Sequence, residues 1–412
     1  MITSIFEEKL SKIGRNLKSS LIRDLLKYAQ IPGAISFGGG APDPETFPSK
    51  ELGEIAKEVL ENEYKFALQY IPTEGDEELK EEFIKLLEKI YGITDVSKEN
   101  MLMTTGSQQA LDILGRIFLD EDSYVIVESP SYLGALNAFY VSFPKFISVP
   151  LEKDGMDINY LEKVLKDLDE KGEIEKVKFI YTVPTFQNPA GVTMSLEKRK
   201  ALIELAEKYD IIIVEDDPYG ALYFDETPPE SIYKMAGKDR VILLNTFSKI
   251  LTPGLRIGVI IADENVISKA IMAKQSADLC SSGLTQRLAA RFLKNYDLFD
   301  YLKNIRTVYK EKRDIMIEAM EEHLKPYGVT WNKPGGGLFI WIELPESYDT
   351  MEMLDIAKEK LVFYIPGKAF LVDVEKSSTA RLSFCLPPKE VIPEGIKRLA
   401  EVIEEYKKEK GL

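Results

Sequence analysis

The segment TFSKILTPGLRIG, residues 246–258, brings an amine, hydroxyl groups and a guanidinium close together in the sequence. Lys249 follows Thr246 and Ser248, and Arg256 stands seven residues further on. A lysine can form an imine with an aldehyde, and it can move protons once burial or neighbouring charge depresses its pKa. The segment therefore indicates an anion site beside an amine nucleophile, although a basic, solvated loop has the same residues.

A second candidate anion site follows the apolar segment MLMTT, residues 101–105. Gly106, Ser107 and Gln108 stand there, at the start of an apolar helical segment. Free backbone amides and the helix dipole at such a position can hold a phosphate. Many helices begin with Gly-Ser only for capping, so this motif alone does not establish a phosphate site.

An acidic run follows another apolar segment, with Glu215, Asp216 and Asp217 ahead of Pro218 and Tyr219. Carboxylates bind magnesium, but no G-K-[ST] phosphate loop or second acidic motif accompanies the run. A carboxylate three residues before a tyrosine, near a lysine and a phosphate clamp, suits a protonated heteroaromatic nitrogen. This combination of groups points to pyridoxal phosphate as the ligand.

These candidates follow segments that read as buried strands. Most of the segments are apolar throughout, which is typical of strands in a mostly parallel sheet covered by helices, where ligands bind beyond the carboxyl ends. The predicted strands are 101–105, 124–128, 179–183, 211–215, 241–245 and 257–262. The predicted helices include 110–119, 195–209 and 49–62, the last with Ser49 as its N-cap.

The pattern of predicted elements changes after about residue 263, where long helices rich in charged residues precede a few short strands. We therefore expect a smaller α/β part made from the C-terminal hundred or so residues and joined by the N-terminal segment. The predicted division is an N-terminal segment over 1–48, a large domain over 49–305 and a small domain over 306–412.

Composition excludes several classes of protein. The 412 residues are 45% hydrophobic, so disorder is excluded, and the net charge of −15 argues against nucleic acid or an anionic membrane as a partner. With one histidine, His323, and two cysteines, no metal site and no histidine-based nucleophile are expected. The sequence has no visible signal peptide or membrane span, which predicts a cytoplasmic protein. Heavy use of Lys and Glu is typical of heat-adapted proteins.

Nine segments, taken in order, resemble the fold type I, class I pyridoxal-phosphate aminotransferases. They are SFGGGAPDPETFP, ALQYIPTEG, TTGSQQALD, ESPSYLGAL, PTFQNPAG, VEDDPYG, TFSKILTPGLRIG, PGGGLFIW and ARLSF. Within that group the sequence is most similar to the kynurenine, 2-aminoadipate and aromatic amino acid aminotransferases. The resemblance implies a large domain built on a mostly parallel sheet, a smaller α/β domain from both termini, and pyridoxal 5'-phosphate as cofactor.

The resemblance also implies roles for individual residues. Lys249 is similar to the lysine that holds the cofactor covalently, Asp216 to the carboxylate on the pyridine nitrogen, and Tyr219 and Asn188 to the donors to the ring oxygen. Tyr132, otherwise an ordinary packing residue at a helix start, resembles the aromatic residue stacked on the ring. The phosphate-binding positions are Gly106, Ser107, Gln108, Thr246, where serine is commoner, Ser248 and Arg256. Tyr70 resembles the tyrosine that reaches the phosphate in the neighbouring subunit, which implies a homodimer with shared sites.

For the substrate, Arg381 resembles the arginine that forks onto the α-carboxylate, helped by Gly40 and Asn188. Arg23 resembles an arginine that meets a distal carboxylate, although it is also an ordinary helix-surface residue. The implied reaction is ping-pong transfer of an amino group from an aromatic amino acid, 2-aminoadipate or kynurenine to 2-oxoglutarate.

Two alternatives remain open. A lyase or decarboxylase could use the same scaffold, because the cofactor motifs do not fix which bond to the α-carbon breaks. A pyridoxal-phosphate-binding regulator without catalysis is disfavoured, because only about forty residues precede the sheet domain, too few for a helix-turn-helix module.

Overall fold

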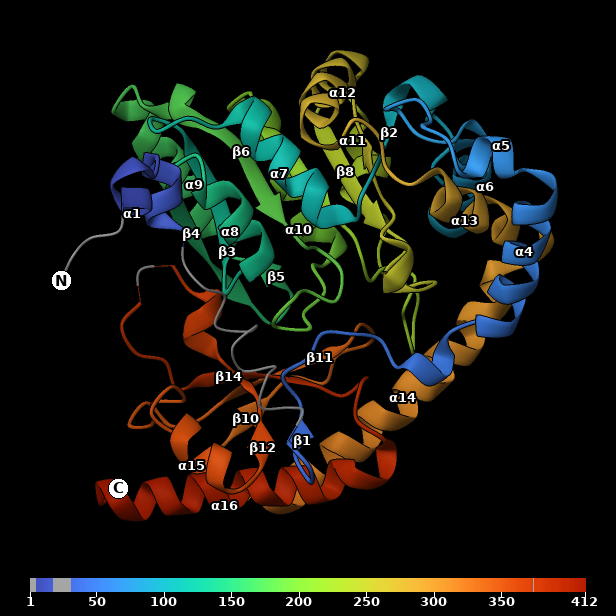
Figure 1. The fold of residues 1–412 in the computed structure, drawn as a ribbon. Helices are drawn as coiled ribbons and strands as arrows, with labels where there is room; N and C mark the ends of the chain where they lie inside the picture. Colours follow the sequence, from blue (N-terminus) through green and yellow to red (C-terminus); the bar gives the residue numbers. More distant parts are fainter. Residues whose placement is uncertain (1–4, 18–30, 373) are drawn as a thin grey trace.

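The computed structural model describes residues 5–17, 31–372 and 374–412, which form an eight-stranded, a four-stranded and a two-stranded sheet (Figure 1). The largest sheet has eight strands in the order β2-β9-β8-β7-β6-β3-β4-β5. Their bounds are β2 Met101–Thr104, β3 Tyr124–Ser129, β4 Lys145–Glu152, β5 Gly155–Met156, β6 Val177–Thr182, β7 Ile212–Asp216, β8 Val241–Thr246 and β9 Gly258–Ile261.

Six of these strands, β2, β8, β7, β6, β3 and β4, run in one direction, and β9 and β5 run against them. The prediction of a mostly parallel sheet is therefore confirmed, and all six predicted segments form strands. The carboxyl ends of β2, β6, β7 and β8 share one edge of the sheet. β4 was not predicted, because Lys145, Pro150 and Glu152 interrupt its apolar pattern, as expected near a sheet edge.

Helices cover both faces of the large sheet (Figure 1). Their bounds are α4 Ser49–Asn62, α5 Tyr64–Ala67, α6 Glu77–Tyr91, α7 Ser107–Phe118, α8 Leu133–Tyr140, α9 Ile158–Glu170, α10 Leu196–Lys208, α11 Ile232–Ala236, α12 Glu264–Asp278 and α13 Gly283–Asn295. α6 shows the local logic: Asp76 caps its N-terminus, Leu79, Phe83 and Leu86 are buried on one face, and Gly92 ends it in the left-handed conformation.

The prediction that Ser49 caps α4 is wrong. Pro48 occupies the N-cap position, without a side-chain hydrogen bond, and Ser49 is the first residue of the helix. The N–H of Ser49 donates to the carbonyl of Phe47, at 2.8 Å, so the chain has already turned before the serine is reached. A serine can cap only from the extended residue that precedes the first turn.

The smaller domain is built from both ends of the chain, as predicted. Its sheet has the order β10-β11-β14-β13, and β1 of the N-terminal segment pairs in parallel with β12. The strands are β1 Ile35–Ser36, β10 Thr330–Trp331, β11 Phe339–Glu343, β12 Val362–Phe363, β13 Ile365–Pro366 and β14 Thr379–Ser383. The helices on this side are α14 Leu298–His323, α15 Leu354–Glu359 and α16 Ile392–Lys410. The helices α1 Ile5–Lys9 and α2 Lys12–Asn16 lie instead beside the large domain, where Lys12 pairs with Glu121 at 2.8 Å (Figure 1).

α14 is one continuous helix that reaches from the large sheet toward the small one (Figure 1). The predicted division between residues 305 and 306 falls inside it, and the three domain boundaries stay predictions. His323 is the last residue of this helix, where it lies beside Glu322. Within the described ranges, no helix combines the length and the apolar character needed to cross a membrane.

Candidate active site

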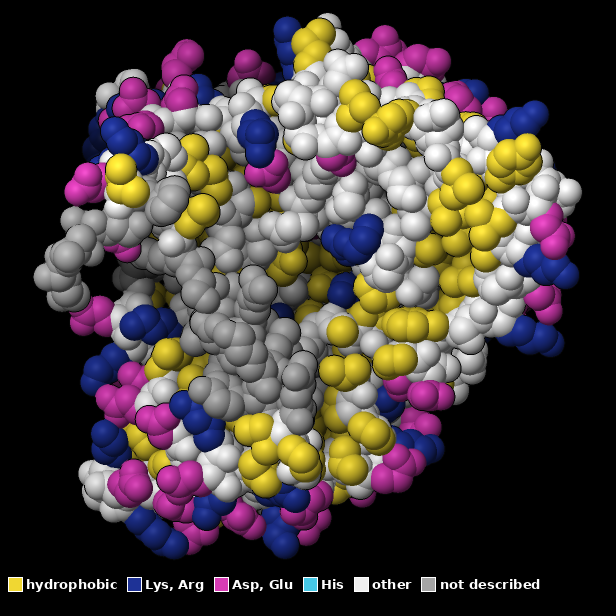
Figure 2. Space-filling view, viewed as in Figure 1, with side chains coloured by type: hydrophobic (Ala, Val, Ile, Leu, Met, Phe, Trp, Pro, Cys, Tyr) yellow, Lys and Arg dark blue, Asp and Glu magenta, His cyan; other side chains and the backbone are white. Residues whose placement is uncertain are grey.

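A cavity of about 270 Å³ lies at the carboxyl ends of β2, β6, β7 and β8, where residues of the small domain close it. Figure 2 shows the molecule hollowed there, with Lys and Arg side chains in the hollow. The cavity brings together twelve residues predicted from the sequence: Gly40, Ser107, Gln108, Tyr132, Asn188, Asp216, Tyr219, Thr246, Ser248, Lys249, Arg256 and Arg381. Gly106 lies directly behind this lining, in contact with Arg256.

Lys249 follows β8 and projects into the cavity, where its Nζ donates to the carbonyl of Gly40 at 2.7 Å. Burial lowers the pKa of the Lys249 ammonium from 10.5 to about 8, and the charges of Arg381 and Arg256 act in the same direction. An amine with a pKa near neutrality can both attack a carbonyl carbon and carry a proton. Lys249 therefore lies in the cavity with a lowered pKa, and its predicted role as amine nucleophile and proton carrier stays a prediction.

Asp216 ends β7 and is buried at the cavity wall. Its Oδ2 accepts a hydrogen bond from the hydroxyl of Tyr181 at 2.8 Å, and its Oδ1 has no hydrogen-bond partner among the described residues. Burial raises the pKa of the Asp216 carboxyl from 3.8 to about 7, although the hydrogen bond from Tyr181 acts against the rise. A buried carboxylate oxygen without a partner is suited to a cationic N–H group.

The other two carboxylates of the acidic run point elsewhere. Glu215 accepts from the backbone N–H groups of Ile232 and Tyr233, at 3.0 and 2.7 Å, and faces Arg199 at 3.9 Å. Asp217 accepts from the N–H of Gly220 at 2.7 Å. The three carboxylates of the run are therefore held by different partners and do not converge on one point. Within the described ranges no group of three or more His, Cys, Asp or Glu side chains has an arrangement that could hold a metal ion.

The loop that carries Asn188 is fixed by two buried charged residues. Glu128 accepts from the Thr182 hydroxyl at 2.6 Å and from the Gln187 amide at 3.1 Å. Arg199 donates to the carbonyl of Pro184 at 2.9 Å. Burial raises the pKa of Glu128 to about 7 against these hydrogen bonds.

Arg381, on β14, links the small domain to this loop. Its Nη1 donates to Oδ1 of Asn188 at 2.9 Å, and its Nη2 donates to the carbonyl of Gly38 at 2.8 Å. The guanidinium lies over the ring of Phe339, 4.3 Å from the centroid, and its Nε has no hydrogen-bond partner among the described residues. Burial lowers the pKa of Arg381 to about 10, so it stays charged at neutral pH. Asn188 also donates to the hydroxyl of Tyr219, at 3.3 Å.

The predicted anion site is compact. Gly106 has φ +77°, and a Cβ there would stand 2.5 Å from Nη2 of Arg256, so glycine is what admits the guanidinium beside the N-terminus of α7. Thr246 donates to the Ser248 hydroxyl at 3.0 Å. Close by, Gln108 lies between the Tyr132 hydroxyl, 3.4 Å from its Oε1, and the carbonyl of Gly134. Free amides, hydroxyls and a guanidinium at one helix start suit a phosphate dianion.

Tyr70, a described residue of the predicted set, does not line the cavity. Tyr70 is 77% exposed on the segment that follows α5, and Arg23 lies outside the described residues. The sequence interpretation missed Tyr181, Phe339, Val183, Pro218 and Pro253. For Tyr181 a signal existed, since its hydroxyl interrupts an otherwise apolar predicted strand. The proline, valine and phenylalanine positions carry no chemical signature by which a sequence alone would select them.

The residues present fit pyridoxal phosphate in three independent respects: an amine of lowered pKa, a compact anion site, and one unpartnered, buried carboxylate oxygen. All three open onto one cavity at the carboxyl ends of parallel strands. The fold and the cavity together define a fold type I, pyridoxal-phosphate-dependent enzyme.

Comparison with known proteins identifies the family. The family model described as "Aminotransferase class I and II" matches residues 34–399. The chain is 46% identical to aromatic-amino-acid aminotransferase 1 of Thermococcus litoralis, over 98% of this chain and 96% of the relative. This chain belongs to the class I and II aminotransferases and is a pyridoxal-phosphate-dependent aminotransferase.

Solved structures of aminotransferases are similar to this chain in both sequence and fold. The crystal structure of Pyrococcus horikoshii kynurenine aminotransferase with PMP, KYN and KYA matches with a TM-score of 0.93 and 46% identity, over 98% of each chain. The alpha-aminoadipate aminotransferase of Thermus thermophilus, complexed with N-(5'-phosphopyridoxyl)-L-leucine, matches with a TM-score of 0.88 and 37% identity, over 97% of this chain and 98% of the other.

Proposed function

We propose that this aminotransferase moves the amino group of aromatic amino acids and of 2-aminoadipate, with kynurenine as a further donor, to 2-oxoglutarate by a ping-pong route. The observation that carries the proposal is Arg381, a buried guanidinium whose Nε has no partner among the described residues, beside the ring of Phe339. A planar guanidinium suits the α-carboxylate, and an aromatic wall suits a large side chain. The names of the similar proteins support the same donors.

Each predicted residue has a proposed role toward the cofactor. Asp216 would pair with the ring nitrogen, Tyr219 and Asn188 would donate to the ring oxygen, and Tyr132 would lie against the ring. The phosphate would be held by Gly106, Ser107, Gln108, Thr246, Ser248 and Arg256. When bound, pyridoxal phosphate supplies an electron-withdrawing ring that accepts negative charge developing at the substrate α-carbon.

Lys249 is the proposed proton carrier. Its Nζ would take the proton from the α-carbon and return it on the cofactor side, which its lowered pKa permits near neutral pH. Arg381, together with Gly40 and Asn188, would fix the carboxylate so that the α-hydrogen faces Nζ. Arg23 would meet a distal carboxylate in dicarboxylic donors. Orientation of this kind is worth several orders of magnitude in rate.

We also propose a homodimer in which Tyr70 reaches the phosphate site of the partner. Tyr70 projects from a side of the molecule with exposed apolar residues, which Figure 2 shows over α4 and α5. Leu60, Tyr64 and Leu68 are each at least 43% exposed on this side. An apolar patch of several large side chains is typical of a protein interface.

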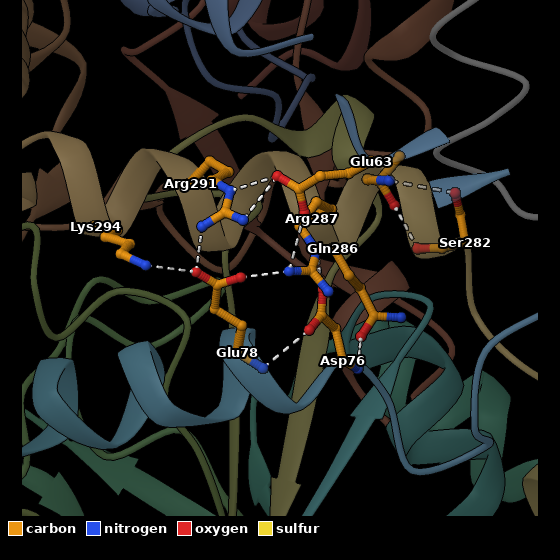
Figure 3. Close-up of polar contacts among 9 residues, drawn as sticks. Glu63, Asp76, Glu78, Ser282, Gln286, Arg287, Arg291 and Lys294 are labelled. Carbon is orange, nitrogen blue, oxygen red and sulfur yellow. Dashed lines mark hydrogen bonds and ion pairs between the residues drawn. The ribbon is translucent and has the colours of Figure 1, made fainter. Parts of the chain in front are cut away.

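An ion-pair cluster holds the segment that carries Tyr70, as Figure 3 shows. The cluster consists of Glu63, Asp76, Glu78, Arg287, Arg291 and Lys294. Glu63 precedes the segment and Asp76 follows it, and both pair with arginines of α13, Glu63 with Arg291 at 2.7 Å and Asp76 with Arg287 at 2.9 Å. The two ends of residues 64–75 are therefore tied to one helix, which would present Tyr70 in a defined place.

A panel of amino donors against 2-oxoglutarate tests the proposed substrates, with glutamate formation as the readout. We expect turnover of tyrosine, phenylalanine, kynurenine and 2-aminoadipate. Arg23→Ala should lower kcat/KM for 2-aminoadipate about tenfold, the value of one charge-assisted hydrogen bond, and leave kcat/KM for phenylalanine unchanged. Unchanged kinetics for every donor would remove Arg23 from the site. Release of pyruvate, ammonia or carbon dioxide in place of glutamate would favour the lyase or decarboxylase alternative.

A further inference from the structure

Asp216 is held by a tyrosine from the neighbouring strand. Tyr181 lies on β6, one residue before its end, and its hydroxyl donates to Oδ2 of Asp216 at 2.8 Å. The ring is fully buried and packs edge-on against Phe139, with 5.6 Å between centroids and 78° between planes. This packing fixes the direction of the phenol, so the hydrogen bond fixes the direction of the carboxylate.

The two carboxylate oxygens of Asp216 therefore differ in their hydrogen bonding. Asp216 lines the cavity; its Oδ2 accepts from Tyr181, and its Oδ1 has no hydrogen-bond partner among the described residues. Burial and the charge of Asp216 raise the pKa of Tyr181 well above its usual value. The phenol therefore stays protonated at neutral pH and remains a hydrogen-bond donor.

Among the described residues, the other charged and titratable groups near Asp216 neither hydrogen-bond nor ion-pair with its carboxylate. Asp217, next in the chain, raises the pKa of Asp216, and the phenols of Tyr132 from the start of α8 and Tyr219 from the following turn face it without hydrogen bonding to it. Lys249 and Arg256 line the same cavity but make no ion pair with it within the described ranges. The Tyr181 hydroxyl is the one side-chain donor to Asp216 in the described part of the chain.

We propose that Tyr181 is a positioning residue for the cofactor: its hydroxyl keeps Asp216 ionised and turned so that Oδ1 meets the ring nitrogen of pyridoxal phosphate. The inference rests on the proposed role of Asp216. It adds a function for a residue that is not among those lining the cavity.

The test compares Tyr181→Phe with Tyr364→Phe in apo-protein. Tyr364 is a matched control, because it is also fully buried and its hydroxyl also makes one 2.8 Å hydrogen bond, to the carbonyl of Thr350 in the small domain. The dissociation constant for pyridoxal phosphate is measured from about pH 5 to about pH 9. Removing a donor to the charged form raises the pKa of Asp216, so affinity should begin to fall at a higher pH on acidification.

We expect Tyr181→Phe to weaken pyridoxal phosphate binding about tenfold near pH 7, the factor for one charge-assisted hydrogen bond. The acid limb of the profile, meaning the pH range in which affinity falls on acidification, should move up by about one pH unit. Tyr364→Phe should change neither. An analogue whose ring nitrogen is replaced by a CH group should bind Tyr181→Phe and wild type equally.

Equal weakening for pyridoxal phosphate and for the CH analogue, or an unmoved acid limb, would overturn the inference and leave Tyr181 a packing residue. Neither measurement uses an amino donor. A failure of the proposed substrates would therefore leave this result standing, and a failure of this inference would leave transamination untouched.

Discussion

The active-site cavity and the ion-pair cluster of Figure 3 are both rich in charge, but they use it in opposite ways. In the cluster, the single carboxylate of Glu78 accepts hydrogen bonds from three cationic side chains, those of Arg287, Arg291 and Lys294. In the cavity, Oδ1 of Asp216 and Nε of Arg381 have no hydrogen-bond partner among the described residues. Oδ2 of Asp76 and Nε of Arg287 in the cluster make no hydrogen bond either, but they form an ion pair with each other at 2.9 Å. Ion-paired charges hold elements together, whereas buried charged groups that form no ion pair among the described residues can bind a charged ligand.

The pKa shifts also differ between the cluster and the cavity. Although burial alone would raise it, the cations Lys294, Arg291 and Arg287 together lower the pKa of Glu78. Burial dominates in the cavity, where it raises the pKa of Asp216 to about 7 and lowers that of Lys249 to about 8. Substitutions in the cavity should therefore change chemistry more than stability, and substitutions in the cluster should do the reverse.

The largest effect is expected from Lys249→Ala. Without the amine that carries the proton, kcat should fall by about 10²- to 10⁴-fold or more, as is usual for loss of a general base. The thermal midpoint should not fall, because Lys249 makes one hydrogen bond, to Gly40, and its buried charge costs hydration energy. Glutamate formation and a thermal melt measure the two parts. Retained turnover, or a large loss of Tm, would contradict the contrast between the regions.

Arg381→Ala should come next. Truncating a buried guanidinium that binds a carboxylate should lower kcat/KM about a hundredfold or more for every amino donor. Arg381→Lys keeps the charge but loses the fork, so its kcat/KM should lie between those of wild type and Arg381→Ala. Steady-state kinetics with phenylalanine and 2-aminoadipate are the measurement. A loss confined to one donor would mean that Arg381 reads a side chain and not the shared α-carboxylate.

The cluster offers a matched pair for stability. The Arg291 side chain is 19% exposed and pairs with both Glu63 and Glu78, whereas Lys294 is 54% exposed and pairs with Glu78. Arg291→Ala should cost about 2 kcal/mol of unfolding free energy and Lys294→Ala less than about 0.5 kcal/mol. Denaturant unfolding at low and high salt checks both values. The kcat per active site should stay close to that of wild type in both variants. Equal losses of unfolding free energy in the two variants would show that partial burial does not strengthen the ion pairs of Arg291.

The smallest expected effect is a difference in pH dependence. Glu128, Glu215 and Asp216 have folded pKa values raised to about 7, so the folded apo-protein binds more protons than the unfolded chain between their ordinary pKa values and 7. Their contribution is full below the unfolded pKa and is lost as pH rises through about 7, so the Tm of the apo-protein should fall from about pH 5 to about pH 8. Asp216→Asn should flatten this fall.

Glu78 gives the opposite sign. Its folded pKa is lowered, so the stability that it contributes is present above its unfolded pKa of 4.5 and is lost on acidification below that value. Glu78→Gln should therefore alter the acid side of the Tm profile and leave the slope between about pH 5 and pH 8 as in wild type. A change in that slope would show that the cluster and the cavity are electrostatically coupled.

The sequence predicts the cavity better than the cluster, and the reason is local. Lys249, Asp216 and Asn188 each follow an apolar strand within a few residues, so a parallel sheet alone brings them to one edge. The cluster joins Glu63 and Glu78 to Arg287 and Arg291, which are more than 200 residues away in the chain. Nothing in either segment marks its charges as different from ordinary helix-surface charges.

The errors of the sequence analysis have similar physical causes. β4 escaped prediction because charges and a proline break its apolar pattern. The two-residue edge strand β5 pairs with only Leu151 and Glu152, so most of the outer side of β4 is unpaired and tolerates such residues. Ser49 fails as a cap because the chain has already turned at Phe47. Tyr181 was passed over because its role depends on register, which sets β6 beside β7 and turns its hydroxyl toward Asp216.

Single-turnover conversion of the bound cofactor tests the central claim most directly. The holoenzyme is mixed with phenylalanine, without any oxo acid, and the cofactor is recovered and identified. The account predicts one equivalent of pyridoxamine 5'-phosphate per active site, with phenylpyruvate in equal amount, and no detectable amount from Lys249→Ala in the time that wild type needs to finish. Release of ammonia or carbon dioxide with the cofactor recovered as pyridoxal phosphate would contradict it.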